Sequence, residues 1–292
     1  MSRNQTAVPT WRQLWRDTAG ALVDPVETRW IIEEVSGLGL PALLRELDRP
    51  ATPAEVARLA EVVGRRLSGE PLQHVLGHWG FRTLEVAVDS RVLVPRPETE
   101  FVVEVALSEL DSLAAKRPRA GLFAVDLGTG SGVIALSLAA ERDAVRVVAV
   151  DRDPAALDVA LANLSRLAPQ ARERVELLAG DWYGALPASY AGRFDLIVAN
   201  PPYLAEHEWA LLDPVVRDFD PVGALVAGPS GLEHISSIVA GAPEWLAAGG
   251  RLVVEIAPSQ NTAVLSLARC AGLRARIEDD LAGRPRVLVA SR

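Results

Sequence analysis

The sequence predicts an α/β fold in which a doubly wound parallel sheet follows a small helical domain. Near-continuous apolar segments of strand length are typical of parallel strands covered on both faces. They occur at 122–125, 145–150, 175–178, 196–199 and 252–256. Helical patterns separate them, as expected for crossover helices, and the clearest lie at 133–140, 154–167 and 259–271. Upstream, residues 1–72 contain helical patterns only.

Composition limits the class of protein. The chain has 292 residues, enough for a large domain and a smaller one, with 49% hydrophobic and 23% charged residues, as in ordinary globular proteins. No apolar segment is long enough to cross a membrane, and the first residues lack the apolar core of a signal peptide. We therefore expect a cytoplasmic protein with no membrane partner. The net charge of −8 argues against broad, charge-driven binding to nucleic acid.

The single cysteine, Cys270, excludes an internal disulfide and any cysteine-cluster metal site. It lies in a helical apolar pattern, which predicts a buried, inert thiol. The four histidines have no metal-ligand spacing, so no metal is expected; they are His74, His78, His207 and His234.

The N-terminal region, residues 1–72, is expected to be a separate helical domain. Residues 25–35 have apolar positions at helical spacing. A second helix is predicted at 53–67. Thr52 caps its start, Pro53 takes the first helical position and Glu55 places an acid in the first turn. The region contains no catalytic constellation. Recognition of a partner and stabilisation of the main domain are equally open as its role.

Residues 73–97 are expected to form a β-hairpin linker to the main domain, 98–292. Residues 84–88 alternate, 89–90 suit a turn, and 92–94 are apolar again. Pro97 and the acids at 98 and 100 suit a helix start. That interpretation does not explain Arg96, which lies between two prolines. At the end of the chain, 284–290 is predicted to return as an antiparallel edge strand.

A glycine-rich loop follows the first predicted strand of the main domain. It consists of Gly128, Thr129, Gly130, Ser131 and Gly132, after Asp126-Leu127. Glycines let a backbone approach a ligand closely. A dinucleotide fingerprint needs a small residue at 133, where this chain has valine. The spacing suits S-adenosylmethionine, whose methionine part carries an amine and a carboxylate but no pyrophosphate; a tight turn is the alternative.

Acidic and aromatic residues follow the next two predicted strands. Asp151 can accept both hydroxyls of a ribose, although a helix cap ahead of Pro154 explains it equally well. Asp181 and Trp182 suit the two sides of an adenine, although a lone tryptophan more often belongs to a core. The glycine loop, Asp151, Asp181 and Asn200 follow four successive strands, so their side chains are expected to converge on one crevice.

The segment Asn200-Pro201-Pro202-Tyr203 ends the fourth of these strands. Two prolines force the chain to leave the sheet rigidly. A planar amide or exocyclic amine needs acceptors for its two N–H bonds before it can attack a methyl group in line. The Asn200 oxygen and a backbone carbonyl of the Pro-Pro step supply acceptors, and Tyr203 supplies a stacking surface. Such catalysis by positioning contributes roughly 7–11 kcal/mol. The alternative is a stiff turn without a chemical role.

These motifs resemble the bacterial N5-glutamine methyltransferases that modify peptide chain release factors. The resemblance covers most of the chain and implies a Rossmann-like class I methyltransferase sheet. It rests on residues 65–66 with 69–73, 92–100, 126–132, 151, 181–182, 200–203 and 283–287. The combination of Pro-Arg-Pro-Glu-Thr-Glu at 95–100 with Asn-Pro-Pro-Tyr is specific. His74 stands where an aromatic residue such as tyrosine is expected.

The resemblance implies a substrate and a cofactor. The substrate is the glutamine of a Gly-Gly-Gln loop on class 1 release factors, held by Asn200, Pro201, Pro202 and Tyr203. The cofactor is S-adenosylmethionine, which is converted to S-adenosylhomocysteine. The residues expected to bind it are 128–132, Asp151, Asp181, Trp182 and Asn200. The N-terminal domain is expected to recognise the body of the release factor.

Two other functions remain as alternatives. An N6-adenine or N2-guanine methyltransferase shares Asn-Pro-Pro-Tyr, but the acidic net charge and the 95–100 signature argue against a nucleic-acid substrate. A non-catalytic protein that binds a translation factor is the second alternative. The intact cofactor and substrate motifs argue against it.

Overall fold

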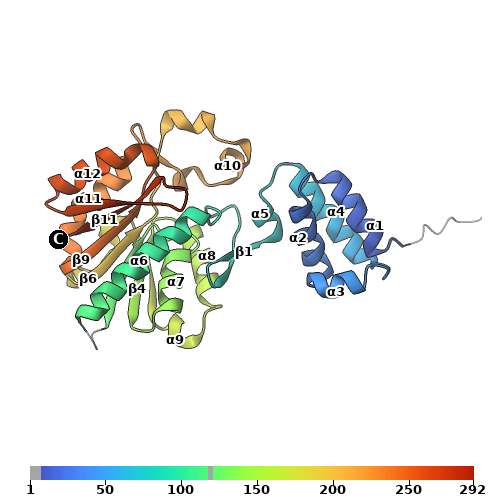
Figure 1. Ribbon diagram of the computed structural model, residues 1–292, viewed down its shortest axis with the longest axis horizontal. Helices are drawn as coiled ribbons and strands as arrows, with labels where there is room; N and C mark the ends of the chain where they lie inside the picture. The colour runs from blue at the N-terminus through green and yellow to red at the C-terminus, as the bar shows by residue number, and fades with distance from the viewer. Residues whose placement is uncertain (1–7, 118–120) are drawn as a thin grey trace, which may run out of the picture. The chain divides into compact units, whose positions relative to one another are not determined.

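The computed structural model describes residues 8–117 and 121–292. The chain divides into two compact units, the first ending at Gly77 and the second beginning at His78 (Figure 1). The first seven residues of the expected 1–72 domain lie outside the described residues.

The first unit is helical. Its helices are α1 (Trp11–Ala21), α2 (Pro25–Ser36), α3 (Leu40–Arg45), α4 (Pro53–Leu67) and α5 (Leu72–Leu76). The predictions at 25–35 and 53–67 are confirmed. Thr52 accepts a hydrogen bond from the amide of Glu55, whose carboxylate accepts one from the amide of Thr52, a capping box that fixes the start of α4. Trp11, Ile31 and Val62 are fully buried in the core of this unit.

The hairpin that opens the second unit differs from the predicted one. Strands β1 (His78–Phe81) and β2 (Leu84–Ala87) pair antiparallel around a turn at Arg82, and residues 92–94 form no strand. Arg82 has φ 50°, and its amide donates to Glu100 while its guanidinium pairs with Glu141. These bonds anchor the turn on the helices behind it. Residues 92–94 do not pair in the hairpin; Val92 packs against helix α8 instead.

A doubly wound sheet forms the centre of the second unit, as predicted, and it has seven strands. Its strands are β3 (Leu122–Leu127), β4 (Val145–Asp151), β5 (Val175–Ala179), β6 (Phe194–Ala199), β9 (Leu246–Glu255), β10 (Arg274–Asp279) and β11 (Pro285–Ser291). Their order is β10-β11-β9-β6-β3-β4-β5, and β11 runs opposite to the other six strands. A separate pair, β7 (Leu204–Ala205) and β8 (Val226–Gly228), lies beyond the end of β6.

The prediction of an edge strand at the end of the chain is only partly correct. β11 is antiparallel, but β10 separates it from the edge. β10 was missed because Arg274, Arg276 and Glu278 interrupt its apolar residues. Charged residues are typical of edge strands, since they discourage pairing with another chain.

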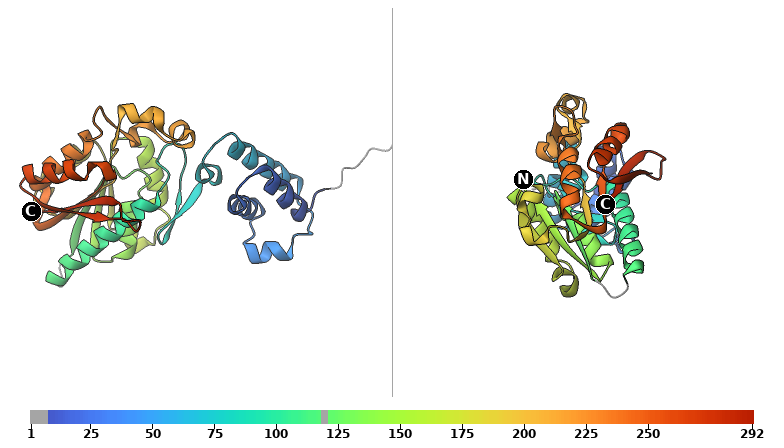
Figure 2. Two further views of the ribbon diagram at one scale, coloured as in Figure 1. Left: turned by 45° about the horizontal axis from the view of Figure 1, so that its top comes forward. Right: turned by 90° about the vertical axis from the view of Figure 1, so that its left-hand side faces the viewer.

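Helices cover both faces of the sheet (Figures 1 and 2). α6 (Pro97–Lys116), α7 (Val133–Glu141) and α8 (Pro154–Leu164) pack on one face, and α11 (Glu233–Trp245) and α12 (Asn261–Cys270) on the other. The shorter helices are α9 (Pro169–Arg172) and α10 (Pro214–Phe219). Cys270 is exposed, so the prediction of a buried thiol is wrong. Val264 and Ala268 form the buried face of α12, and Cys270, two residues later, points away from it.

The order of the strands predicts where a ligand crevice lies. β3 lies between β4 and β6, and the chain proceeds outward from β3 on one side and from β6 on the other. The carboxyl ends of β3 and β6 therefore mark the topological switch point, where open α/β sheets bind their ligands. Among the helices of the described residues, none has both the length and the apolar character to cross a membrane.

Candidate functional site

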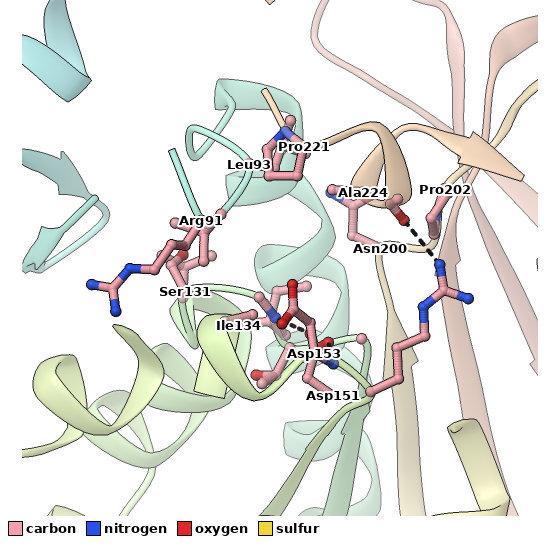
Figure 3. A pocket seen from close by; sticks show the side chains of 18 of the residues that line it. Arg91, Leu93, Ser131, Ile134, Asp151, Asp153, Asn200, Pro202, Pro221 and Ala224 are labelled. Atoms are coloured by element: carbon pink, nitrogen blue, oxygen red, sulfur yellow. Dashed lines mark hydrogen bonds between the residues drawn. The ribbon is translucent and has the colours of Figure 1, made fainter. Parts of the chain in front are cut away.

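A cavity of about 510 Å³ lies at the carboxyl ends of the parallel strands (Figure 3). The loops after β3, β4, β5 and β6 all contribute to it, together with residues 91–96 and 221–224. The predicted convergence of four strand ends on one crevice is therefore present. Thr129 and Gly130 reach it from β3, Asp151 from β4, Asp181 from β5 and Asn200 from β6.

Two positions of the glycine loop strongly favour glycine. Gly128 has φ 76°, and a Cβ there would lie 3.1 Å from the Trp182 ring. Gly132 has φ 87°, and a Cβ there would lie 3.1 Å from the Leu136 side chain. Both conformations are in the left-handed region that favours glycine. Gly128, Thr129, Gly130 and Ser131 line the cavity, whereas Gly132 does not.

Asp126 holds this loop from behind. Its Oδ2 accepts hydrogen bonds from the Thr129 hydroxyl at 2.6 Å and from the Ala135 amide at 3.2 Å. The side chain is fully buried, and Oδ1 has no hydrogen-bond partner among the described residues. Burial raises the pKa of Asp126 to about 7, because an ionised carboxylate loses its hydration there. Asp126 thus links the end of β3 to the start of α7.

Asp151 faces the cavity and organises the loop next to it. Its Oδ2 accepts from the Gly130 amide at 2.8 Å, and its Oδ1 accepts from the Asp153 amide at 3.0 Å. The alternative that Asp151 caps the next helix is wrong, because Asp153 caps α8 by accepting from the Ala155 amide. Each oxygen of Asp151 retains a further lone pair. The carboxylate can therefore accept hydroxyl groups from a ligand without releasing the loop.

Asp181 and Trp182 line the cavity after β5. Asp181 precedes the 3₁₀ turn η1 (Trp182–Ala185), and its side chain makes no cap hydrogen bond to that turn. Trp182 has φ 45°, and its ring lies against Gly128 and 5.3 Å from the ring of His234. Trp182 also packs on the hydrophobic core. Its ring therefore belongs both to the core and to the wall of the cavity.

The residues of Asn-Pro-Pro-Tyr divide between the cavity and the protein interior. Asn200 and Pro202 line the cavity, whereas Pro201 and Tyr203 are absent from its lining. Pro201 is buried. Tyr203 packs on the core, and its carbonyl accepts a hydrogen bond from Gln260 Nε2 at 3.0 Å. Burial raises the pKa of Tyr203 to about 12, so its ring is neutral at physiological pH.

Two residues for which the sequence predicted no role at the site, Thr99 and Glu255, hold the Asn200 side chain. Asn200 Nδ2 donates to the Thr99 hydroxyl at 3.0 Å, and Thr99 donates to Glu255 Oε2 at 3.0 Å. Thr99 and Glu255 are buried. Thr99 lies in the first turn of α6, and Glu255 ends β9. No pattern within the sequence links these distant positions.

Residues 221–224 border the cavity and are tied to its other walls. The Arg96 guanidinium lies 2.6 Å from Asp220, and the Arg152 guanidinium donates to the Gly223 carbonyl at 3.5 Å. Figure 3 shows Pro221 and Ala224 in the lining. Arg96 was the one residue of its segment that a helix start did not explain, and its contact with Asp220 supplies the reason. In the part of the chain that the structure describes, no cluster of three or more potential metal ligands is found.

Comparisons with known proteins agree with these features. Residues 18–77 match the family model of the PrmC N-terminal domain, and residues 107–219 match that of the methyltransferase small domain. A release factor glutamine methyltransferase of Bordetella pertussis is 42% identical over 271 residues, which are 91% of this chain and 96% of the relative. One of Rhodospirillum rubrum is 38% identical over 283 residues, which are 96% of this chain and 83% of the relative.

One solved structure is also similar to part of this chain. The release factor-specific protein-(glutamine-N5) methyltransferase of Alicyclobacillus acidocaldarius is 30% identical and covers 68% of this chain and 94% of its own, with a TM-score of 0.41. The methyltransferase domain implies a methyl donor of the S-adenosylmethionine type. The motifs predicted this relationship, and the identity over almost the whole chain confirms it: the chain belongs to the family of release factor glutamine methyltransferases.

Proposed function

We propose that this enzyme transfers a methyl group from S-adenosylmethionine to the side-chain nitrogen of the glutamine in the Gly-Gly-Gln loop of class 1 release factors. The observation that carries the proposal is the arrangement of Asn200, with its amide nitrogen bound to Thr99 and its side chain lining the cavity. That arrangement leaves the Asn200 oxygen able to accept a hydrogen bond from the amide of a substrate. The proposed substrate also implies the cytoplasm, where release factors act.

The residues that would hold the cofactor fit its groups. Asp151 offers lone pairs for the two ribose hydroxyls, and Asp181 and Trp182 offer a carboxylate and a ring for the adenine. The backbone of Gly128, Thr129, Gly130, Ser131 and Gly132 would contact the methionine part, because the glycines leave it accessible. When bound, the cofactor supplies a sulfonium methyl group as the electrophile. Asn200 would contact both the cofactor and the substrate.

Asn200, Pro201, Pro202 and Tyr203 would orient the glutamine: Asn200 and Pro202 from the cavity lining, and Pro201 and Tyr203 by holding the segment in place behind it. The Asn200 oxygen and a backbone carbonyl of the Pro-Pro step accept the two hydrogens of its amide group, and the rigid prolines fix the direction of that carbonyl. Held in this way, the nitrogen would be presented in line to the methyl group that the bound cofactor supplies. The extra proton on nitrogen leaves late, to water. The contribution of these residues is positioning, which is worth roughly 7–11 kcal/mol in favourable cases.

The N-terminal unit is proposed to recognise the body of the release factor. Its support is a separate hydrophobic core, its match to the PrmC N-terminal domain over 18–77 and the division of the chain at Gly77. The proposed parts are a helical domain expected over 1–72, a linker over 73–97 and a methyltransferase domain over 98–292; because helix α5 belongs to the first unit, the helical part extends to Gly77.

The proposal is tested with radiolabelled S-adenosylmethionine and three acceptors: a purified class 1 release factor, the same factor with its Gly-Gly-Gln glutamine replaced by alanine, and DNA or RNA. Transfer to the intact factor alone is the expected result. Transfer to nucleic acid with none to the factor would contradict the proposed substrate. Equal labelling of the intact and alanine-substituted factors would contradict the proposed target residue.

A further inference from the structure

We propose that Glu255, acting through the Thr99 hydroxyl, determines which end of the Asn200 amide faces the cavity. The inference rests on the proposed function, in which the Asn200 oxygen accepts a hydrogen bond from the substrate amide. A carboxamide has a donor end and an acceptor end of nearly equal size. Its shape alone therefore leaves two orientations, and the wrong one would present N–H groups to a substrate that also carries N–H groups.

The sheet brings these residues together. Ala199 of β6 pairs with Val254 of β9 in parallel register, so Asn200 and Glu255 follow at the same level of neighbouring strands. Side chains alternate between the two faces of a sheet. Val198 and Val253 belong to the core cluster under α6, which places Asn200 and Glu255 on the α6 face. Thr99 lies there, in the first turn of α6.

Counting hydrogens fixes the direction of the contacts. The Thr99 hydroxyl carries one hydrogen, and an ionised carboxylate can only accept. The hydroxyl hydrogen therefore goes to Glu255 Oε2, 3.0 Å away, and the hydroxyl oxygen accepts from Asn200 Nδ2, also 3.0 Å away. The donor end of the Asn200 amide is thereby occupied, and its oxygen is left for the cavity. Glu255 and Thr99 are positioning residues, since neither is proposed to touch the reacting atoms.

Protonation of Glu255 would change the hydrogen-bond relay that runs from Glu255 through Thr99 to Asn200. Burial raises the pKa of Glu255 to about 7, while the Thr99 hydroxyl and Arg286 of β11 act in the opposite direction and Glu98 of α6 adds to the increase. Tyr203 lies nearby and is neutral. A protonated Glu255 can donate to Thr99, whose hydrogen would then be free for position 200. The direction of the relay would reverse.

The reversal permits a test by double substitution. Asn200→Asp places an acceptor-only carboxylate opposite Thr99, so two carboxylates compete for one hydroxyl hydrogen. Glu255→Gln in the same chain supplies an N–H that donates to Thr99, whose hydrogen can then go to the carboxylate at position 200. In the otherwise unchanged chain, Glu255→Gln should cost only a few-fold in rate, because the new amide oxygen can still accept from Thr99.

The experiment measures single-turnover methylation of a release factor at pH 8 with saturating cofactor, for the wild type, the two single variants and the double variant. The double variant is expected to be faster than Asn200→Asp alone by about tenfold, the ratio for one well-formed hydrogen bond to a charged group. The Asn200→Asp variant should also gain rate relative to wild type as the pH falls from 8 to 6. A general loss of folding cannot produce either gain.

A second pair of variants makes the test independent of the carboxylates. Thr99→Ser keeps the hydroxyl and should retain a rate within a few-fold of wild type. Thr99→Val keeps the shape but removes the hydroxyl, and should lose roughly tenfold or more. Calorimetry of S-adenosylmethionine binding to every variant reports whether the fold and the cofactor site persist.

The outcomes separate the two proposals. A wild type that methylates the release factor, together with a double variant no faster than Asn200→Asp, overturns the relay and leaves the proposed function intact. Equal rates for Thr99→Val and Thr99→Ser also overturn the relay. A wild type with no transfer to the release factor overturns the proposed function, and this inference fails with it.

Discussion

The guanidinium of Arg96 lies 2.6 Å from the carboxylate of Asp220, which is 124 positions further along the chain. The Asp220 side chain is 1% exposed and that of Arg96 is 37% exposed, so a buried negative charge is paired with a cation at the protein surface. The Val94 amide also donates to Asp220, at 3.4 Å. The contact joins the segment before α6 to the segment after Asn-Pro-Pro-Tyr, on two sides of the same cavity.

Replacement of Arg96 by alanine should destabilise the protein. The loss of one partner of a buried ion pair costs about 3–5 kcal/mol. Because Arg96 is partly exposed, water can replace some of its contacts, and we expect a cost of roughly 2 kcal/mol. Urea unfolding at neutral pH measures this cost.

Arg217→Ala is the matched control for this prediction. Arg217 pairs with Asp218 close to the same segment, but both side chains are at least 36% exposed. Its removal should cost less than about 1 kcal/mol. Equal stability losses for the two variants would show that the Arg96 pair has no special role.

The sequence predicts the sheet better than it predicts the connections. The strands at 122–125 and 196–199 were found because continuous apolar segments require burial on both faces. The hairpin was misplaced because its turn depends on Arg82, whose left-handed conformation is held by Glu100 and Glu141. Those contacts lie 18 and 59 residues away, beyond the reach of a local pattern.

At the site, too, residues with a local sequence pattern were predictable and residues linked only by distant contacts were not. Residues at strand ends, such as Asp151 and Asn200, were predictable because parallel strands finish at one edge of the sheet. Thr99 and Glu255 were missed, since they are 156 positions apart and each has an ordinary local explanation. Thr99 lies in a helix start, and Glu255 ends an apolar strand. Only the three-dimensional register reveals that both contact the surroundings of Asn200.

Replacement of Asp151 by alanine should weaken S-adenosylmethionine binding by roughly 1.5–3 kcal/mol, because the ribose loses a charged acceptor. The Gly130 amide also loses its partner, which adds disorder to the loop. Asp151→Asn keeps one acceptor oxygen and should fall between alanine and wild type. Isothermal titration calorimetry gives the three affinities, and an unchanged affinity in a folded alanine variant would remove Asp151 from the binding site.

Stability should depend on pH through Asp126. Its pKa is raised from 3.8 to about 7 in the folded protein, so the folded state binds this proton more tightly than the unfolded state does. The stabilisation is complete below about pH 4 and is lost as the pH rises through about 7. Asp126→Asn removes this dependence, and its stability relative to wild type should therefore rise by a few kcal/mol between pH 4 and pH 8.

Urea unfolding of the cofactor-free protein across that pH range tests this expectation. Asp143→Asn is the control, because the Asp143 side chain is fully exposed and its substitution should leave the shape of the curve unchanged. Parallel stability curves for wild type and Asp126→Asn would contradict the assignment of a proton to Asp126.

Removal of the N-terminal unit should separate cofactor binding from recognition of the release factor. A chain that begins at His78, where the second unit starts, should bind S-adenosylmethionine with the affinity of the whole protein. It should methylate a full-length release factor poorly, but a short Gly-Gly-Gln peptide as well as the whole protein does. If the shortened chain folds and keeps full activity on the release factor, the N-terminal unit has another role.

Substitution of Asn200 tests the central step of the proposed mechanism. Asn200→Ala removes the acceptor for the substrate amide and the bond to Thr99, so the methylation rate should fall far more than the affinity for S-adenosylmethionine. Asn200→Asp keeps an acceptor but adds charge and loses the donor. It should therefore be slower than wild type and faster than the alanine variant, because a misplaced acceptor still orients one N–H bond.

Single-turnover methylation with saturating cofactor is the appropriate measurement, since it isolates the chemical step from product release. The rate for Asn200→Ala is expected to fall by at least about 100-fold, which corresponds to roughly 2.7 kcal/mol of lost positioning. An alanine variant as fast as wild type would exclude Asn200 from orienting the amide. A rate for Asn200→Asp below that of Asn200→Ala would instead show that the added charge outweighs the retained acceptor, and the geometry at position 200 would then require a neutral side chain.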